Sequence, residues 1–162
     1  MIDAAVSGAM GRLGRAIANG IAAAEDMRLS GLHAPGHEGQ LFGDVRISGD
    51  AEKLSAQVVV ECAPADVVME NLRTWHEKGL FVVVGTSGFT EKRLKELKSF
   101  WRAEDPGCLV VPNFSIGAVL MMHFAEFASP LAALAEPWRA LAPAADRSRP
   151  GTVNALCKRS VI

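Results

Sequence analysis

Three glycines at regular spacing lie near the start of the chain, in the segment Gly8-Ala9-Met10-Gly11-Arg12-Leu13-Gly14. An apolar run, Ile2 to Ser7, precedes this segment, and residues with helical spacing follow it. Glycines between a strand and a helix permit a tight turn and let backbone amides approach a diphosphate at the helix N-terminus. The pattern predicts a dinucleotide phosphate site. A turn whose glycines serve packing alone is the alternative interpretation.

Arg12 stands where the first turn of that helix is expected. A cation there opposes the helix dipole unless an anion lies nearby. We therefore interpret Arg12 as a phosphate partner, with a solvated arginine that leans away from the helix end as the alternative.

The second apolar run, Met27 to Leu32, ends without a carboxylate in Ser30-Gly31-Leu32-His33-Ala34. Domains that bind NAD usually carry an acidic residue at this strand end, where it holds the ribose hydroxyls. Its absence removes a repulsion against a 2′-phosphate, and His33, His37 and Arg12 are candidates to supply positive or hydrogen-bonding groups. We expect the cofactor to be NADPH or NADH. Two histidines without a third ligand do not predict a metal site.

Two further loops follow apolar runs. Gly85-Thr86-Ser87-Gly88 follows Val82-Val83-Val84, and Pro112-Asn113-Phe114-Ser115-Ile116-Gly117 follows Val110-Val111. Each combines small residues with hydroxyl groups and accessible backbone. Glu61-Cys62-Ala63-Pro64 ends another such run, and Glu61 is either a polar contact to the cofactor or a partly buried carboxylate held by backbone amides.

Short apolar runs alternate with segments of helical spacing, such as Val68, Leu72 and Trp75. Continuous valine runs are typical of parallel strands covered on both faces. The alternation predicts an α/β domain with a doubly wound, Rossmann-like parallel sheet, in which the loops after the strands share one ligand-binding edge. The expected strands are Ile2 to Ser7, Met27 to Leu32, a short one around Val45, Gln57 to Cys62, Leu80 to Val84 and Cys108 to Val111.

The composition excludes several classes of protein. The 162 residues are 49% hydrophobic and 22% charged, with 17 basic and 18 acidic side chains. This balance argues against a disordered chain and against a general nucleic-acid binder, which needs surplus positive charge. The three cysteines include no Cys-x-x-Cys pair, and no apolar run is long enough to cross a bilayer. We expect reduced thiols, no metal, no membrane partner and a cytoplasmic location.

The composition changes at Ser129, after which Ala, Pro and Arg dominate. No strand is evident there, and prolines would interrupt any helix. These prolines are Pro130, Pro137, Pro143 and Pro150.

Three motifs together resemble those of the dihydrodipicolinate reductases (4-hydroxy-tetrahydrodipicolinate reductases) of bacterial lysine and diaminopimelate biosynthesis. They are Gly8 to Gly14, Gly85-Thr86-Ser87-Gly88-Phe89 and Asn113-Phe114-Ser115-Ile116-Gly117, and the likeness extends from Ile2 to Ala128. The resemblance implies a tetrameric oxidoreductase that transfers a hydride from NADH or NADPH to a small molecule, a cyclic dicarboxylate imine. The cofactor-binding residues that it implies are Gly8, Ala9, Met10, Gly11, Arg12, Leu13, Gly85, Thr86, Ser87, Pro112, Asn113, Phe114 and Ser115.

The chain departs from the family downstream of these motifs. The family's His-His-x-x-Lys-x-Asp-Ala-Pro-Ser-Gly-Thr motif, which supplies the proton donor, is not found, so no catalytic residue is assigned. Gly151 and Thr152 are candidates for its closing substrate-binding pair. We expect a dinucleotide-binding domain over residues 1–128 and an incomplete second domain, a truncated or degenerate start of the substrate domain, over residues 129–162. The alternative functions are a non-catalytic dinucleotide-binding module and a dehydrogenase of the aspartate or homoserine type, whose motifs fit less well.

Overall fold

The structure is a computed structural model that describes residues 1–132 and the side chains of residues 1–128. The chain divides into two compact units, Met1–Val111 and a second that begins at Pro112, and each is described by itself. The predictions for residues 133–162, which include Gly151 and Thr152, lie outside the described residues.

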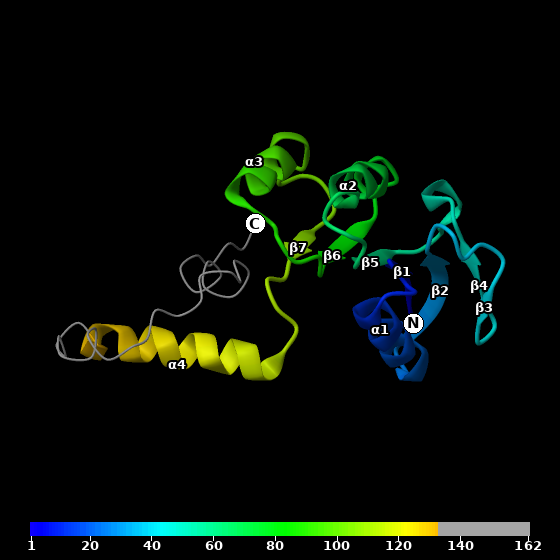
Figure 1. The fold of residues 1–162 in the computed structure, drawn as a ribbon. Coiled ribbons are helices and arrows are strands. Elements are labelled where there is room, and N and C mark those ends of the chain that lie inside the picture. Colours follow the sequence, from blue (N-terminus) through cyan, green and yellow to red (C-terminus); the bar gives the residue numbers. More distant parts are fainter. Residues whose placement is uncertain (133–162) are drawn as a thin grey trace. The chain divides into compact units, whose positions relative to one another are not determined.

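The first unit is built on a seven-stranded sheet with the strand order β3-β4-β2-β1-β5-β6-β7 (Figure 1). Every neighbouring pair is parallel except β3 and β4. The doubly wound α/β fold predicted from the alternating apolar runs is therefore confirmed. The strands are β1 (Ile2–Ser7), β2 (Met27–His33), β3 (Leu41–Phe42), β4 (Val45–Ser48), β5 (Val58–Glu61), β6 (Phe81–Val84) and β7 (Cys108–Val110).

Helices cover both faces of this sheet, as Figure 1 shows, with α1 (Arg12–Ala23) on one face and α2 (Val68–Glu77) and α3 (Glu91–Phe100) on the other. The helix α1 packs Ala18 and Ile21 against β1, β2 and β4. The opposite core gathers Trp75 and Leu97 against β1, β5 and β6. Because both faces are buried, the strands carry the continuous apolar runs that the sequence shows.

The hairpin of β3 and β4 differs from the expectation of one short strand around Val45. The strand β3 is only two residues long, too short to produce a visible period. Gly43 has φ +58° in the tight turn that joins β3 to β4, a conformation that favours glycine.

The second unit contains the helix α4 (Ile116–Ala132). The side chain of Asn113 accepts a hydrogen bond from the Ser115 amide (2.9 Å), and Ser115 Oγ accepts one from the Ala118 amide (3.4 Å). These side chains cap the start of α4. The helix continues two residues beyond Pro130, so the prediction that this proline interrupts a helix is wrong. Among the helices within residues 1–132, none is long and apolar enough to cross a membrane.

Candidate functional site

The predicted loops lie at the carboxyl edge of the sheet. Ser7, at the end of β1, is in register with His33 at the end of β2 and with Glu61 at the end of β5. Glu61 is in turn in register with Val84 at the end of β6. The loops that follow these four strands therefore begin side by side, as the crossover rule for parallel sheets requires.

Gly8 and Gly14 meet strict packing requirements. Gly8 has φ +72°, and a Cβ there would lie 2.6 Å from the backbone of Cys62 and Ala63. A Cβ on Gly14 would overlap the carbonyl oxygen of Gly8 and lie 2.9 Å from Ala9 Cα. For these two glycines the packing interpretation is sufficient.

Gly11 is different, because packing constrains it much less than it constrains Gly8 and Gly14. Its φ is −71°, an ordinary value for any residue, and an added Cβ would meet only the Gly8 carbonyl oxygen, at 3.3 Å. Gly11 is exposed and stands as the N-cap of α1. A requirement for glycine here would have to come from something outside the described part of the first unit that approaches the loop.

The N-terminus of α1 is open. Gly11 provides no side-chain cap, and no acidic residue lies in the first turn. The amides of Met10, Arg12 and Leu13 donate to no described residue, while those of Gly8 and Ala9 both donate to the His33 carbonyl oxygen, at 2.9 and 3.2 Å. Arg12 is in the first helical turn, as predicted, and its exposed guanidinium has no ion pair within the described part of the chain. This combination of free amides and an unpaired cation suits an anion.

Three buried polar residues, Ser7, His33 and Glu61, lie side by side at the ends of β1, β2 and β5. Side chains of α2 contact them. His33 Nδ1 lies 3.1 Å from Ser7 Oγ, and Asn71 Nδ2 donates to the same oxygen (3.4 Å). The His33 ring stands edge-on to Trp75, with 6.0 Å between the ring centroids. Sequence reasoning missed Ser7, Asn71 and Trp75, although their positions at a strand end and on the buried face of a helical pattern were visible.

Glu61 is completely buried, and both carboxylate oxygens accept hydrogen bonds. Ala63 N donates to Oε1 (2.7 Å), and Trp75 Nε1 donates to Oε2 (2.8 Å). Of the two interpretations of Glu61, the structure supports a strand-end carboxylate held by amides rather than a direct contact with a cofactor. The alternation along β5 explains its direction, since Glu61 follows Val59 on the face that α2 covers.

Burial lowers the pKa of His33 below its ordinary value of 6.5. The negative charges of Glu61 and Asp50 and a hydrogen bond to the Gly49 backbone act in the opposite direction and do not cancel this effect. His33 is only 5% exposed, and its ring is held against Ser7. Of the positive or hydrogen-bonding group that His33 was expected to supply to a 2′-phosphate, the structure disfavours the positive one, because the side chain is buried against Ser7 and burial lowers its pKa.

His33 makes the stability of the first unit depend on pH. Because the pKa of His33 is lower in the folded chain, the unfolded chain binds the proton more tightly. The contribution of neutral His33 to the free energy of unfolding is therefore fully present above about pH 6.5. It is lost as the pH falls towards the pKa of the folded chain. We expect the free energy of unfolding lost in His33→Gln to be larger at pH 7.5 than at pH 5.5, as measured by urea denaturation of both chains. An equal loss at the two pH values would contradict a neutral, buried His33.

The loop after β6 is tied to the loop after β5. Thr86 is buried, and its Oγ1 donates to the Ala63 carbonyl oxygen at 2.7 Å. The Gly85 amide donates to the Glu61 carbonyl oxygen (2.8 Å). Ser87 is exposed, and its hydroxyl has no partner in residues 1–132.

Cys62 lies in the same loop region but is not suited to thiolate chemistry. Desolvation and then the charge of Glu61 raise its thiol pKa to about 12. Burial raises the pKa of Cys108 to about 11. Both thiols are thus protonated at neutral pH, and thiolate is the reactive form of cysteine. No group of three or more metal-ligating side chains occurs in the part of the chain that the structure describes.

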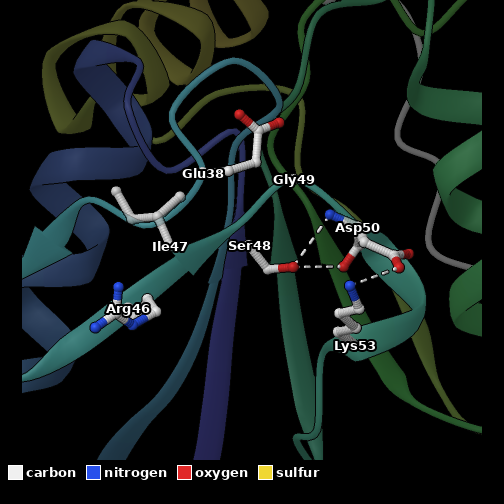
Figure 2. A pocket seen from close by; sticks show the side chains of 7 residues that line it. All are labelled: Glu38, Arg46, Ile47, Ser48, Gly49, Asp50 and Lys53. Atoms are coloured by element: carbon white, nitrogen blue, oxygen red, sulfur yellow. Dashed lines mark hydrogen bonds and ion pairs between the residues drawn. The ribbon is translucent and has the colours of Figure 1, made fainter.

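A pocket of about 540 Å³ opens beside the carboxyl ends of β2 and β4 (Figure 2). Its charged side chains are of both signs, and Lys53 Nζ lies 3.5 Å from Asp50 Oδ2. Ser48 Oγ donates to the Asp50 carbonyl oxygen and accepts from the Asp50 amide. The lining residues are Glu38, Arg46, Ile47, Ser48, Gly49, Asp50 and Lys53.

The structure thus brings some of the predicted site residues together. Gly8–Leu13 and Gly85–Ser87 lie at one edge of the first unit. Gly8 packs against the backbone of Ala63, and Thr86 donates a hydrogen bond to the Ala63 carbonyl oxygen. Pro112–Ser115 belong to the second unit, where Asn113 and Ser115 cap α4.

The family model described as "Dihydrodipicolinate reductase, N-terminus" matches residues 2–114. The chain belongs to the dihydrodipicolinate reductase family. A relative from Rippkaea orientalis, named 4-hydroxy-tetrahydrodipicolinate reductase, is 39% identical over 147 residues, which cover 80% of this chain and 54% of the relative. A relative of the same name from Cutibacterium acnes is 42% identical over 132 residues and is covered to 48%. The chain spans about half the length of these relatives of the reductase family.

A solved member of the reductase family has the same fold. The dipicolinate-bound dihydrodipicolinate reductase from Paenisporosarcina sp. TG-14 superposes with a TM-score of 0.68 at 29% identity, over 80% of this chain and 54% of that one. Membership of the reductase family and the Rossmann-like fold imply a pyridine nucleotide cofactor.

Proposed function

We propose that the first unit binds NADPH or NADH and that the protein reduces 4-hydroxy-tetrahydrodipicolinate, a cyclic dicarboxylate imine, in lysine and diaminopimelate biosynthesis. The observation that carries the proposal is the open N-terminus of α1, where the amides of Met10, Arg12 and Leu13 have no partner among residues 1–132. The relatives named 4-hydroxy-tetrahydrodipicolinate reductase support the choice of reaction.

In this proposal each loop holds one part of the cofactor. The amides at the start of α1 donate to the diphosphate, and the exposed Arg12 guanidinium neutralises part of its charge. Gly85–Ser87 hold the nicotinamide end, and Pro112–Ser115 line the cleft towards the substrate. The bound nucleotide supplies the hydride, and the protein provides orientation and electrostatics.

The nucleotide preference is proposed to depend on the pocket beside β2 and β4. Arg46 and Lys53 are the cations that a 2′-phosphate would attract, and Glu38 and Asp50 are the carboxylates that a ribose diol would meet (Figure 2). In the free chain Lys53 pairs with Asp50 and Arg46 donates to the Gly39 carbonyl oxygen, so a bound nucleotide would exchange these contacts for its own. Both signs of charge line one pocket, which supports use of NADPH or NADH. By family resemblance we also propose a homotetramer in the cytoplasm.

A non-catalytic dinucleotide-binding module is the second candidate function. The sequence contains no His-His-x-x-Lys motif, and reduction of an imine requires a proton donor opposite the nicotinamide. Calorimetric binding of NADPH without imine-dependent oxidation of NADPH would favour this second candidate. Imine-dependent oxidation would favour the reductase.

Gly11→Ala tests the proposed site. In the free chain the added methyl group would meet only the Gly8 carbonyl oxygen, at 3.3 Å, a tight contact that a small shift of the loop relieves. In the proposal it also lies where the diphosphate approaches the loop. We expect the dissociation constant for NADH and NADPH to rise at least about tenfold, while the free energy of unfolding changes by less than about 1 kcal/mol. Calorimetric titration and urea denaturation measure the two effects.

Two results would count against the site. If the unaltered chain binds neither nucleotide at millimolar concentration, the proposed function is wrong. If Gly11→Ala binds as tightly as the unaltered chain, the glycine loop does not hold the diphosphate.

A further inference from the structure

Both peptide groups of Ala63 are held by buried side chains. Its amide donates to Glu61 Oε1 (2.7 Å), and its carbonyl oxygen accepts from Thr86 Oγ1 (2.7 Å). Glu61 is 0%, Ala63 6% and Thr86 8% exposed. We call these three residues the Ala63 clamp. A buried hydrogen bond to a backbone group restricts that group to one position, because breaking it leaves a polar atom without water.

The Ala63 clamp touches the two loops to which opposite ends of a dinucleotide are assigned. On one side, Gly8 lies so close to Cys62 and Ala63 that a Cβ would come within 2.6 Å of their backbone. On the other side, Thr86 belongs to the loop after β6, and the adjacent Gly85 amide donates to the Glu61 carbonyl oxygen. Ala63 therefore connects the glycine loop to the loop after β6 through direct contacts.

The Thr86 hydroxyl has its single proton committed to Ala63. Its Oγ1 lies 2.7 Å from the Ala63 carbonyl oxygen and 3.5 Å from that of Glu61, and both are acceptors. A hydroxyl has one proton to donate, so Thr86 has none left for a ligand carbonyl. The neighbouring Ser87 is exposed and unpaired in the described residues, so its hydroxyl is the one that can meet a ligand.

We propose that Thr86 and Glu61 are positioning residues that act through Ala63 and set the spacing between the diphosphate loop and the nicotinamide loop. This inference rests on the proposed function, since it assumes that one nucleotide spans both loops. An intact dinucleotide must satisfy both loops at once, whereas ADP-ribose needs only the glycine loop. Loosening the Ala63 clamp should therefore weaken the binding of the intact dinucleotide selectively.

The test compares Thr86→Val, which keeps the side-chain shape and removes the donor, with Thr86→Ser, which keeps the donor. NADH and ADP-ribose are titrated calorimetrically into each chain, with NADPH and 2′-phospho-ADP-ribose as the pair if NADPH binds more tightly. We expect Thr86→Val to raise the dissociation constant of the dinucleotide about tenfold and that of the ADP-ribose fragment by less than about twofold. Thr86→Ser should retain tight binding of both.

The outcomes separate the inference from the proposed function. Equal weakening of dinucleotide and fragment, or no weakening of either, would overturn the positioning role while leaving nucleotide binding intact. Failure of the unaltered chain to bind any of these ligands would overturn the proposed function and the positioning role together. If circular dichroism shows that Thr86→Val does not fold, Thr86→Ala removes the same donor without the added methyl group and decides by the same comparison.

Discussion

Gly8→Ala is expected to lower the free energy of unfolding by about 3 kcal/mol. Gly8 adopts φ +72°, where an alanine alone costs roughly 1–2 kcal/mol. The added Cβ would also lie 2.6 Å from the backbone of Cys62 and Ala63, and backbone atoms at the end of β5 cannot move without disturbing the sheet. Urea denaturation of both chains measures the loss.

Gly36→Ala is the matched control for this prediction. Gly36 has φ +85°, yet an added Cβ would meet no atom within 4 Å. Its expected cost is the conformational one alone, about 1 kcal/mol. The difference between the two variants isolates the contact of the glycine loop with β5, and equal losses would show that this contact is loose.

Trp75→Phe is expected to cost about 3 kcal/mol of the free energy of unfolding. The indole Nε1 of Trp75 donates to Glu61 Oε2 at 2.8 Å, in a region where both residues are completely buried. Phenylalanine has no N–H, so one oxygen of a buried carboxylate loses its hydrogen bond. Hydrogen bonds to charged groups are stronger than neutral ones, and an unsatisfied buried charge is costly.

Trp101→Phe provides the comparison with a neutral acceptor. Trp101 is also buried, and its Nε1 donates to the Pro106 carbonyl oxygen at 2.6 Å. The same substitution there should cost about 1 kcal/mol in hydrogen bonding. Urea denaturation at pH 7.5 measures both variants. A loss in Trp75→Phe no larger than that in Trp101→Phe would mean that Glu61 does not depend on the indole.

The pattern of residues was sufficient to predict most of the strands. The valine runs in β5 and β6 are continuous because helices cover both faces of the sheet. A strand that is buried on both faces needs apolar residues at successive positions, and this is visible in the sequence of each strand. The hairpin strand β3 was missed because two residues cannot display a period. The extension of α4 past Pro130 was also missed, because a local rule about proline was applied to a helix that the structure describes up to Ala132.

The location of the candidate site was also predictable, but the roles of its side chains were not. A glycine cluster between strand and helix identifies the loop, yet the three glycines look alike in the sequence. The structure shows that Gly8 and Gly14 are required by packing and that Gly11 is free of such a requirement. His33 was expected to face a ligand, and instead it is buried against Ser7.

The sequence by itself therefore determined the succession of strands along the chain, the edge of the sheet at which the loops lie and the family resemblance. Each of these depends on residues that are neighbours in the chain or that repeat at a fixed period. Only the tertiary structure decided the pairing of Glu61 with Trp75 and of Thr86 with Ala63. These partners lie 14 and 23 positions apart. Their contact depends on how α2 and the loop after β6 pack against β5, and no local pattern encodes that packing.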